Sequence, residues 1–288
     1  MCKKKILITG AGGFIGYYFY KKLKKKDNFD IYCTVNSHIN TKIKKNLLKI
    51  RATKNIKLLS IDLKNLKKTK ETIKKINPHI IYHFAAYSDH KSSEQNKLIC
   101  RRNNVLVTTN IMRSIDSSCK IVFLSTDKVY SQNPNKSPET INLKPMGYLA
   151  KQKLECEKII KRKTKKFFIL RLPIVHGLGQ NYNNSVIDNF LYKLKKKRRI
   201  KVFKNIERSF LMINDLNNIL EVLIESKNYG IYNVGSDLIS YSNRVKNLCK
   251  LININYANLI DEINGIIYPV KQNFNIIKVK KKFNFKFY

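Results

Sequence analysis

The 288-residue chain is predicted to be an α/β protein with a doubly wound parallel sheet followed by a smaller C-terminal lobe. Three observations predict this class. Short runs that are apolar throughout alternate with amphipathic segments from the first residues onward, as in strands buried on both faces. A glycine-rich turn joins the first run to the first amphipathic segment. After Pro173 this alternation gives way to loops rich in Gly and Asn.

The expected elements follow one another in a regular order. The predicted strands are Lys5–Thr9, Ile31–Val35, Ile56–Ile61, Ile80–Phe84, Lys120–Ser125 and Phe167–Leu172. The predicted helices are Phe14–Lys26, Thr41–Arg51, Leu66–Ile76, Ile99–Ser117 and Tyr148–Lys163, followed beyond Pro173 by Val186–Arg199 and Leu211–Glu225. Strands separated by amphipathic helices form a parallel sheet with helices on both faces.

Charge is the most unusual feature of the composition. The chain has 58 Lys+Arg against 19 Asp+Glu, a formal net charge of +39. An acidic partner such as nucleic acid, an anionic membrane surface or a phosphorylated substrate would account for it, and so would compositional drift. The basic residues are spread over the whole length, without zinc-finger spacing or an aromatic-rich RNA-binding signature. This argues against a nucleic-acid-binding protein, which stays the third functional alternative.

The cysteines and the first residues bear on the cellular compartment. Six cysteines form neither a CxxC pair nor a metal-ligand spacing, so we expect reduced thiols and no metal site. The basic start and the apolar run after it resemble a signal peptide, but glycines interrupt the run and no small-residue cleavage site follows. No stretch reaches the roughly 18 apolar residues of a membrane span. We therefore expect a cytoplasmic protein without a membrane partner.

The loop between the first strand and the first helix carries the strongest motif. Gly10, Gly13 and Gly16 recur at three-residue spacing. Glycines permit a tight turn and let the backbone approach a pyrophosphate, and the helix N-terminus presents unpaired N–H groups to the phosphates. The loop therefore predicts a Rossmann-like dinucleotide-binding domain over residues 1–172. Residues 173–288 are expected to form a substrate-binding lobe, with elements that pack back on the first domain.

The end of the second strand bears on the choice between NAD and NADP. An acid there holds the ribose 2′-hydroxyl of NAD, whereas a basic residue accommodates the 2′-phosphate of NADP. Here the strand runs into Asn36 without an acid, and Lys42, Lys44 and Lys45 follow. The pattern leans slightly to NADP, and both dinucleotides stay open.

These motifs resemble the extended short-chain dehydrogenase/reductase family, which includes nucleotide-sugar epimerases, 4,6-dehydratases and dTDP-4-dehydrorhamnose reductases. The glycine loop is similar to the family's TGxxGFIG segment, and Ser60-Ile61-Asp62-Leu63 and His83-Phe84-Ala85-Ala86 match two further segments. Asn104 sits where the family has a helix asparagine. The cofactor-binding residues that the resemblance implies are Gly10, Gly13, Phe14, Ile15, Gly16, Asn36, Asp62, Leu63, Ala85, Ala86, Asn104 and Lys153.

The segment after the fifth strand resembles the S-[ST]-D-x-V-Y segment of these enzymes. By that match, Thr126 would hydrogen-bond the sugar oxygen at the reacting carbon. Asp127 and Lys128 fall where 4,6-dehydratases place their acid/base pair, and an adjacent carboxyl and ammonium suit the elimination of water. The alternative is that Asp127 caps the next turn while Lys128 is solvated.

The family also has a tyrosine and a lysine four residues apart on the next helix, where the lysine lowers the pKa of the phenol. Lys153 matches that lysine, but Leu149 occupies the tyrosine position. Tyr148 is one residue away, a rotation of about 100° on a helix. Three alternatives stay open. An irregular helix start brings Tyr148 into place beside Lys151 or Lys153, the Asp127–Lys128 pair moves the protons, or the chain binds the dinucleotide for regulation or scaffolding without catalysis.

Two segments of the C-terminal lobe extend the resemblance. Leu170–Gly177 resembles the family's LRxxxVYG segment, with His176 in place of tyrosine. The segment around Arg208 resembles the one whose arginine grips the nucleotide-sugar diphosphate, a task that suits a planar fork of donors. The alternative for Arg208 is a surface salt bridge to Glu207 or Asp215. The resemblance thus implies a nucleotide-sugar substrate, hydride transfer at a sugar hydroxyl or ketone, and a homodimer.

Overall fold

The computed structural model describes residues 3–35, 56–130, 139, 143–179, 184–266, 271–272 and 275–285. The chain divides into two compact units. Unit 1 comprises Met1–Val129, Lys144–Arg171 and Ile219–Tyr232, and unit 2 comprises Tyr130–Leu143, Leu172–Asn218 and Asn233–Tyr288. The helix expected over Thr41–Arg51 lies outside the described residues.

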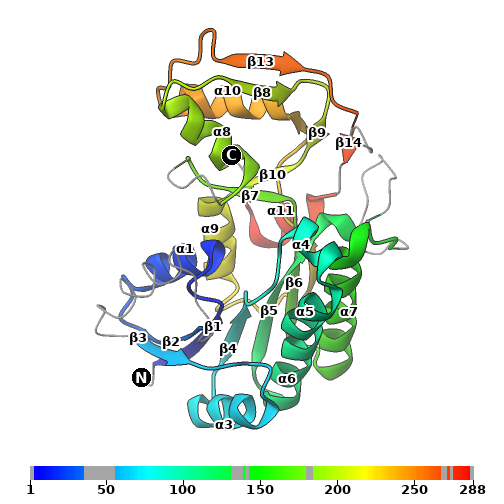
Figure 1. Cartoon of the computed structure of the whole chain (residues 1–288). Helices are drawn as coiled ribbons and strands as arrows, with labels where there is room; N and C mark the ends of the chain where they lie inside the picture. Colours follow the sequence, from blue (N-terminus) through cyan, green and yellow to red (C-terminus); the bar gives the residue numbers. More distant parts are fainter. Residues whose placement is uncertain are drawn as a thin grey trace. The chain divides into compact units, whose positions relative to one another are not determined.

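Unit 1 is built on a seven-stranded sheet in the order β3-β2-β1-β4-β5-β6-β11 (Figure 1). Its strands are β1 (Lys4–Thr9), β2 (Phe29–Val35), β3 (Ile56–Ser60), β4 (Ile80–His83), β5 (Lys120–Thr126), β6 (Phe167–Leu172) and β11 (Gly230–Asn233). The pairings of β1 with β2 and β4, of β2 with β3 and of β4 with β5 are all parallel. The expected doubly wound α/β class is confirmed, with the strand order reversing between β1 and β4, where such folds bind ligands.

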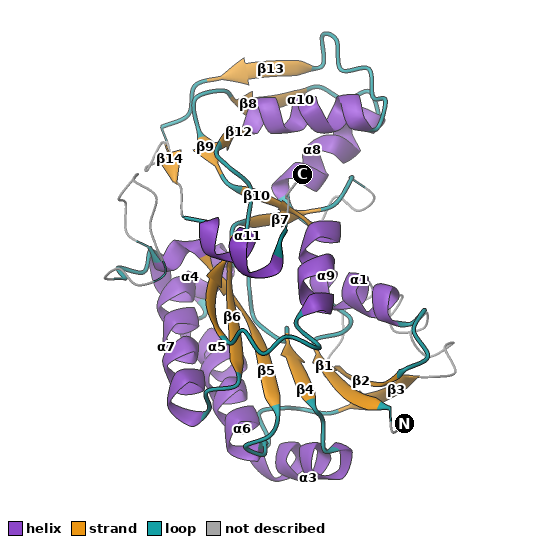
Figure 2. Ribbon diagram, turned by 180° about the vertical axis from the view of Figure 1, so that it is seen from behind, coloured by secondary structure: helices purple, strands orange, loops and turns teal. Residues whose placement is uncertain are grey.

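Helices cover both faces of this sheet (Figures 1 and 2). One face carries α3 (Leu66–Ile76), α5 (Lys97–Arg101), α6 (Val107–Ser114) and α7 (Gly147–Lys163), with α4 (His90–Gln95) packed against α7. The opposite face carries α1 (Phe14–Leu23) and the second half of α9 (Ile213–Val222). There Phe19 packs against Tyr82 at a ring-centroid distance of 4.5 Å, and the Tyr82 hydroxyl donates to the carbonyl of Leu220.

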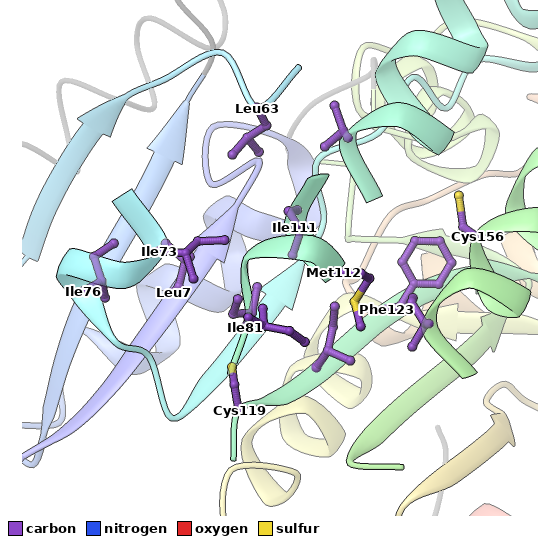
Figure 3. Packing of buried hydrophobic residues seen from close by; sticks show 14 of the residues in the cluster. Leu7, Leu63, Ile73, Ile76, Ile81, Ile111, Met112, Cys119, Phe123 and Cys156 are labelled. Carbon is purple, nitrogen blue, oxygen red and sulfur yellow. The ribbon is translucent and has the colours of Figure 1, made fainter. Parts of the chain in front are cut away.

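An apolar cluster of unit 1 lies between the sheet and α3, α6 and α7 (Figure 3). Leu7, Ile81 and Phe123 come from three neighbouring strands, and Ile111 and Cys156 meet them from the helices. All of these side chains are buried. Burying an aliphatic or aromatic side chain of this size contributes about 1.5–3 kcal/mol, so this cluster fixes the helices on the sheet.

The helix expected over Ile99–Ser117 is interrupted. It forms α5, then a π-helical turn η1 (Arg102–Leu106), then α6, which ends at Ser114. A π turn accommodates one extra residue within a helix. Here the turn contains Asn104, whose side chain accepts from the Tyr87 backbone N–H and donates to the Tyr87 carbonyl. The sequence pattern gives no sign of this turn because the apolar spacing continues across it.

Unit 2 contains short sheets and two longer helices. The pairs are β7 (Ile174–His176) with β10 (Phe210–Met212), and β8 (Ile200–Phe203) with β13 (Ile260–Ile263). A third sheet has the order β12 (Ile239–Ser240), β9 (Glu207–Arg208), β14 (Lys271–Gln272). The helices are α8 (Val186–Lys195), α10 (Tyr241–Leu251) and the short α11 (Ile277–Phe283).

Two of the helices expected beyond Pro173 are shorter than predicted. The first ends as α8 at Lys195, because Lys197 takes a left-handed backbone with φ of +54° and β8 begins at Ile200. The second was expected from Leu211, but Phe210–Met212 pairs with β7 as a strand. Apolar residues are compatible with both a helix and a strand, so the pairing with β7 determines that this segment is a strand. None of the helices in the described part of the chain is long and apolar enough to cross a membrane.

A buried chain of hydrogen bonds ties β1 to β4 and α6. The Thr108 hydroxyl donates to the Asn104 carbonyl at 2.8 Å, so it accepts from His83 Nε2 at 3.0 Å. His83 Nδ1 then accepts from the Thr9 hydroxyl at 2.9 Å. Burial, with the neighbouring Lys153 charge, lowers the pKa of His83 to about 3. The network therefore requires a neutral imidazole with its proton on Nε2.

This neutral histidine makes the stability of the protein depend on pH. The pKa of His83 is lower in the folded state than the usual value near 6.5, so the unfolded chain binds the proton first. The contribution is complete above pH 6.5 and falls as the pH drops toward 3. Relative to His83→Gln, which cannot titrate, the wild type should lose about 1.4 kcal/mol of unfolding free energy per pH unit between pH 6 and 4. Urea denaturation at several pH values measures the difference, and a constant difference would contradict the assignment.

Candidate functional site

The loop after β1 is shaped by glycines that the backbone geometry requires. Gly10 has φ of +68°, and a Cβ there would lie 2.7 Å from the backbone nitrogen of Ala85. A Cβ on Gly16 would lie 2.4 Å from the carbonyl oxygen of Gly10. At Gly13 the nearest atom to such a Cβ is the same oxygen at 3.3 Å, so the neighbouring protein leaves more room there. Gly10 and Gly16 are thus fixed by close packing, whereas Gly13 keeps one side of the loop open.

The loop ends in the first turn of α1. Gly13 is the N-terminal cap and has no side chain to cover the first N–H groups. Its own N–H donates to the Gly10 carbonyl at 3.0 Å, which closes the turn. Phe14 and Ile15 form the start of the helix and are half-buried. The helix therefore begins with donors that no capping side chain occupies.

The end of β4 is held against this loop. The backbone N–H groups of Phe84 and Ala85 both donate to the Thr9 hydroxyl oxygen at 3.1 Å. Thr9 is in turn fixed by His83, as described above. These bonds place Ala85 and Ala86 beside the glycine loop, at the switch point of the sheet.

A pocket of about 240 Å³ opens at this edge of unit 1. It is lined by the glycine loop, the ends of β2, β3 and β4, and η1 and α6. The lining residues are Gly10, Gly12, Gly13, Thr34, Val35, Ile61, Asp62, Leu63, Phe84, Ala85, Ala86, Tyr87, Asn103 and Val107. Among the described residues, the buried Thr34 hydroxyl has no hydrogen-bond partner, and Thr34 lines the pocket. Six of the expected cofactor residues line this pocket: Gly10, Gly13, Asp62, Leu63, Ala85 and Ala86. Asn36 lies outside the described residues, and the lining does not include Phe14, Ile15, Gly16, Asn104 or Lys153.

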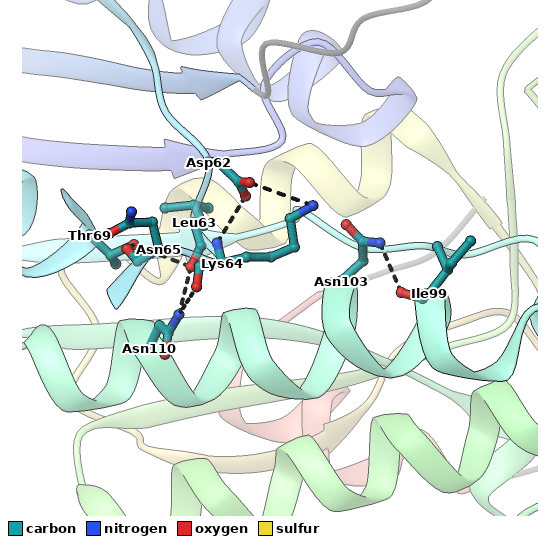
Figure 4. Close-up of polar contacts among 8 residues, drawn as sticks. All are labelled: Asp62, Leu63, Lys64, Asn65, Thr69, Ile99, Asn103 and Asn110. Atoms are coloured by element: carbon teal, nitrogen blue, oxygen red, sulfur yellow. Dashed lines mark hydrogen bonds and ion pairs between the residues drawn. The ribbon is translucent and has the colours of Figure 1, made fainter. Parts of the chain in front are cut away.

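Asp62 lies in the turn after β3 and lines the pocket. Figure 4 shows its contacts with Lys64. Its Oδ1 accepts from the Lys64 N–H at 3.0 Å, and its Oδ2 lies 3.5 Å from the Lys64 ammonium. The next carbonyl, that of Leu63, accepts from the Asn110 side chain at 3.0 Å and from the Thr69 hydroxyl at 3.2 Å. Asp62 is 42% exposed, so its carboxylate can still reach a ligand.

Two neighbouring asparagines on the π turn have different positions. Asn104 is buried and holds the Tyr87 backbone. Asn103 lines the pocket, and its side chain donates to the Ile99 carbonyl at 2.8 Å. The pocket residues Thr34, Tyr87 and Asn103 were not expected from the sequence. The unbroken helical pattern in this region conceals the turn that decides which asparagine faces the pocket.

The segment after β5 forms the short helix η2 (Asp127–Val129) at the same edge of the sheet. The Thr126 hydroxyl donates to Asp127 Oδ1 at 3.1 Å and accepts from the Lys128 N–H at 3.2 Å. Asp127 is buried, and Lys128 is partly buried. The structure thus brings these three predicted side chains together in one turn.

The start of α7 separates the two residues that the family pairs. Lys153 is buried, donates to the Leu124 carbonyl at 2.9 Å and lies 4.7 Å from the centroid of the Phe123 ring. Burial lowers the pKa of its ammonium. Leu149, four residues earlier, is buried on the same side. Tyr148 lies against α5 instead, where the Lys97 ammonium sits 5.8 Å from its ring centroid.

A buried ion pair fixes α7 on the sheet. Glu157 accepts from Arg171 through both oxygens, at 3.1 and 2.7 Å, and from the Ser125 hydroxyl at 2.6 Å. Glu157 lies one turn beyond Lys153, and Ser125 directly precedes Thr126. The pair therefore sets the position of both the helix and the end of β5.

Within unit 2, Arg208 lies on β9 and is buried. It donates to the carbonyl of Glu207 at 2.7 Å, while the Glu207 carboxylate pairs with Lys271 at 3.1 Å. His176 is also buried and accepts from the Arg244 guanidinium at 3.0 Å. Burial and the Arg244 charge lower the pKa of His176 to about 4, so it packs as a neutral side chain.

Groups of three or more His, Cys, Asp and Glu side chains that could hold a metal ion are absent from the described residues.

Two curated relatives are similar to most of this chain. The dTDP-D-glucose 4,6-dehydratase of Dictyostelium discoideum is 26% identical over 267 residues, 81% of this chain and 58% of that protein. Methionine adenosyltransferase 2 subunit beta of Danio rerio is 27% identical over 189 residues, 64% of this chain and 52% of that protein. The matches thus span little more than half the length of these relatives.

The fold is also found among solved structures. The UDP-N-acetylglucosamine 4-epimerase of Methanobrevibacter ruminantium M1, in complex with UDP-N-acetylmuramic acid, superposes with a TM-score of 0.84 at 20% identity. The match covers all of this chain and 94% of that one. The model of the NAD dependent epimerase/dehydratase family matches residues 6–235, which confirms the resemblance expected from the motifs. The chain belongs to the NAD dependent epimerase/dehydratase family.

Proposed function

We propose that this chain binds NAD or NADP at the glycine loop and acts on a nucleotide-sugar as an epimerase, dehydratase or reductase. The observation that carries the proposal is the pocket at the strand-order reversal, next to the Gly10–Gly16 loop, in a member of an NAD-dependent family. When bound, the dinucleotide supplies the acceptor and donor of hydride for a sugar hydroxyl or ketone.

The residues present fit such a cofactor. Gly13 leaves open the side of the loop that a Cβ would occupy, and the buried Thr34 hydroxyl has no hydrogen-bond partner in the part of the chain that the structure describes. Asp62 and Leu63 would contact the adenosine portion, with Ala85 beside the loop. Val35 at the end of β2 brings no carboxylate to the pocket, in line with the slight preference for NADP that the sequence indicates. Lys42, Lys44 and Lys45 lie outside the described residues.

The protein's own residues would hold the substrate and move its protons. Thr126 would orient the reacting oxygen, and Lys153 would support the ribose nearest the chemistry. Asp127 and Lys128 stand in one turn with Thr126, whereas the Tyr148 ring lies at Lys97. This arrangement favours the Asp127–Lys128 pair over Tyr148 for proton transfer, since a base must reach its proton.

We place substrate recognition in residues 173–288, the predicted substrate lobe. Arg208 would bind the diphosphate, because its guanidinium can donate to two oxygens at once. Arg208 is buried, which supports this role over a surface salt bridge to Glu207 or Asp215.

A second candidate function is binding without catalysis, in regulation or as a scaffold. Leu149 stands where the family's tyrosine would be, and it cannot exchange a proton. One relative is, by name, the subunit beta of a methionine adenosyltransferase. A role as a dinucleotide-binding subunit is therefore the alternative to turnover.

We further propose a cytoplasmic homodimer. Leu98, Ile99 and Leu106 on α5 and η1 are exposed by 69%, 49% and 37%, and a partner copy would cover them. The described cysteines are buried free thiols, which suits a reducing compartment.

Dinucleotide binding is tested by separating the roles of the glycines. Gly13→Val should keep the fold but weaken NAD and NADP binding at least 100-fold, because its side chain blocks backbone approach to the pyrophosphate. Gly16→Ala should instead destabilise the protein by about 1–3 kcal/mol, since its Cβ meets the Gly10 carbonyl. Calorimetric titration and urea denaturation measure the two effects. A wild type that binds neither dinucleotide would refute the cofactor assignment.

Turnover is tested by offering UDP-, dTDP-, GDP- and CDP-sugars with each dinucleotide and following product mass. Loss of water, an isomer of equal mass or a gain of two hydrogens distinguishes dehydratase, epimerase and reductase. Asp127→Asn should then lower turnover by about 10²–10⁴, the usual share of a placed proton donor, while Tyr148→Phe changes it little. Dinucleotide affinity should survive in both variants.

The opposite ranking of the two variants would assign the protons to Tyr148. A wild type that binds dinucleotide and sugar nucleotide yet forms no product would establish the binding-only alternative.

A further inference from the structure

His90 is a titratable side chain at the same edge of the sheet, outside every motif discussed above. It is the first residue of α4, and it follows the pocket-lining segment after β4 by three residues. Asp89 caps the helix, with its Oδ1 accepting from the Ser92 N–H at 2.7 Å. The imidazole is thus held in the first turn of the helix and remains accessible to solvent.

A contact of Glu94 shows which side of α4 packs against α7, and helical spacing places His90 on that side. Glu94 lies four residues after His90 and therefore on the same side of the helix. Its Oε1 accepts from the Tyr148 N–H at 2.5 Å, at the start of α7. The adjacent Met146 N–H donates to the Lys128 carbonyl at 2.8 Å. The helix α4 and the turn η2 both contact α7, so the His90 side of α4 and η2 are linked through the start of α7.

The charges near His90 bear on the imidazole. Partial burial and the Lys128 charge lower the pKa of His90, and Asp89 and Glu94 oppose them. Lys91 on the same helix is exposed. A pKa below the usual 6.5 leaves the imidazole neutral at pH 7 and able to accept a proton.

Such a group would complement the Asp127–Lys128 pair, which suits the elimination of water. Oxidising a sugar hydroxyl requires an acceptor for its proton, and Leu149 cannot serve. Tyr148 contacts Glu94 through its backbone, but its ring lies at Lys97. Histidine is the side chain most often used for general acid–base catalysis.

We propose that His90 takes up and returns the hydroxyl proton at the reacting sugar carbon, next to Lys128. The proposal rests on the proposed function, whose dinucleotide is the oxidant. As the carbon loses its hydride, the O–H bond breaks, its proton passes to the imidazole nitrogen and the C=O bond forms. In the reverse step the imidazolium returns the proton to the oxygen.

The first test is kinetic. His90→Gln keeps a polar side chain of similar length but cannot carry a proton at neutral pH. It should lower kcat by about 10²–10⁴ with dinucleotide affinity unchanged, and it should remove the acidic limb of the kcat profile. Lys91→Gln, a change of the exposed neighbour, is the matched control and should leave turnover within threefold of the wild type.

The second test needs no turnover. The imidazole resonances of His90, assigned by comparison with His90→Gln, are followed by NMR as a function of pH in the full chain. The pKa should lie below 6.5 and should rise in Lys128→Met, because the neighbouring positive charge is removed. It should fall in Glu94→Gln, which removes a carboxylate that favours the charged form.

The outcomes separate this inference from the function on which it rests. An active wild type with an equally active His90→Gln variant overturns the role of His90 and leaves the protons to Asp127 and Lys128. A pKa of His90 that does not respond to Lys128→Met overturns it as well. A wild type that binds both ligands without product overturns the proposed function, and the role of His90 falls with it.

Discussion

The site depends on one close approach of two backbones. Because Gly10 has no Cβ, the loop after β1 lies directly against the backbone of Ala85 at the end of β4. Any side chain there would push apart the two strands between which the strand order reverses, and the pocket lies at that point. The Thr9 hydroxyl oxygen stabilises this contact, because it accepts hydrogen bonds from the backbone N–H groups of Phe84 and Ala85 at the end of β4. The remaining parts of the pocket are positioned relative to this pair.

Buried polar groups hold the strands and helices in the arrangement that the glycines make possible. His83 links Thr9 to Thr108 and so connects β1, β4 and α6 through one neutral ring. Glu157 links α7 to Arg171 and Ser125. Breaking a buried pair of this kind by removing one partner costs about 3–5 kcal/mol, because a charge stays buried without compensation. Such groups stabilise one arrangement of the strand ends, and replacing any one of them destabilises the protein.

The sequence predicted well those features that depend on local pattern. Apolar runs and amphipathic spacing located the strands and most helices of unit 1, and the glycine spacing located the turn at the pocket. The prediction from the sequence was wrong or silent where a contact between residues distant in the chain determines the local structure. The strand Phe210–Met212 pairs with β7, although its sequence continues the pattern of the following helix. The π turn rotates Asn104 toward Tyr87, and Thr34 faces the pocket because of strand register; neither has a signature in the sequence.

The position of Tyr148 shows how strongly one residue of helix rotation matters. Residues four apart share a side of a helix, so Lys153 shares its side with Leu149, and Tyr148 shares its side with Gln152. Since Glu157 and Arg171 hold α7 in place, turning the helix by about 100° to bring Tyr148 beside Lys153 would break a buried ion pair. The loss of this ion pair opposes a rotation of α7 that would bring the Tyr148 phenol beside Lys153. Under the proposed function, the proton acceptor would instead come from the turns after β4 and β5, two neighbouring parallel strands whose carboxyl ends lie at the same edge of the sheet.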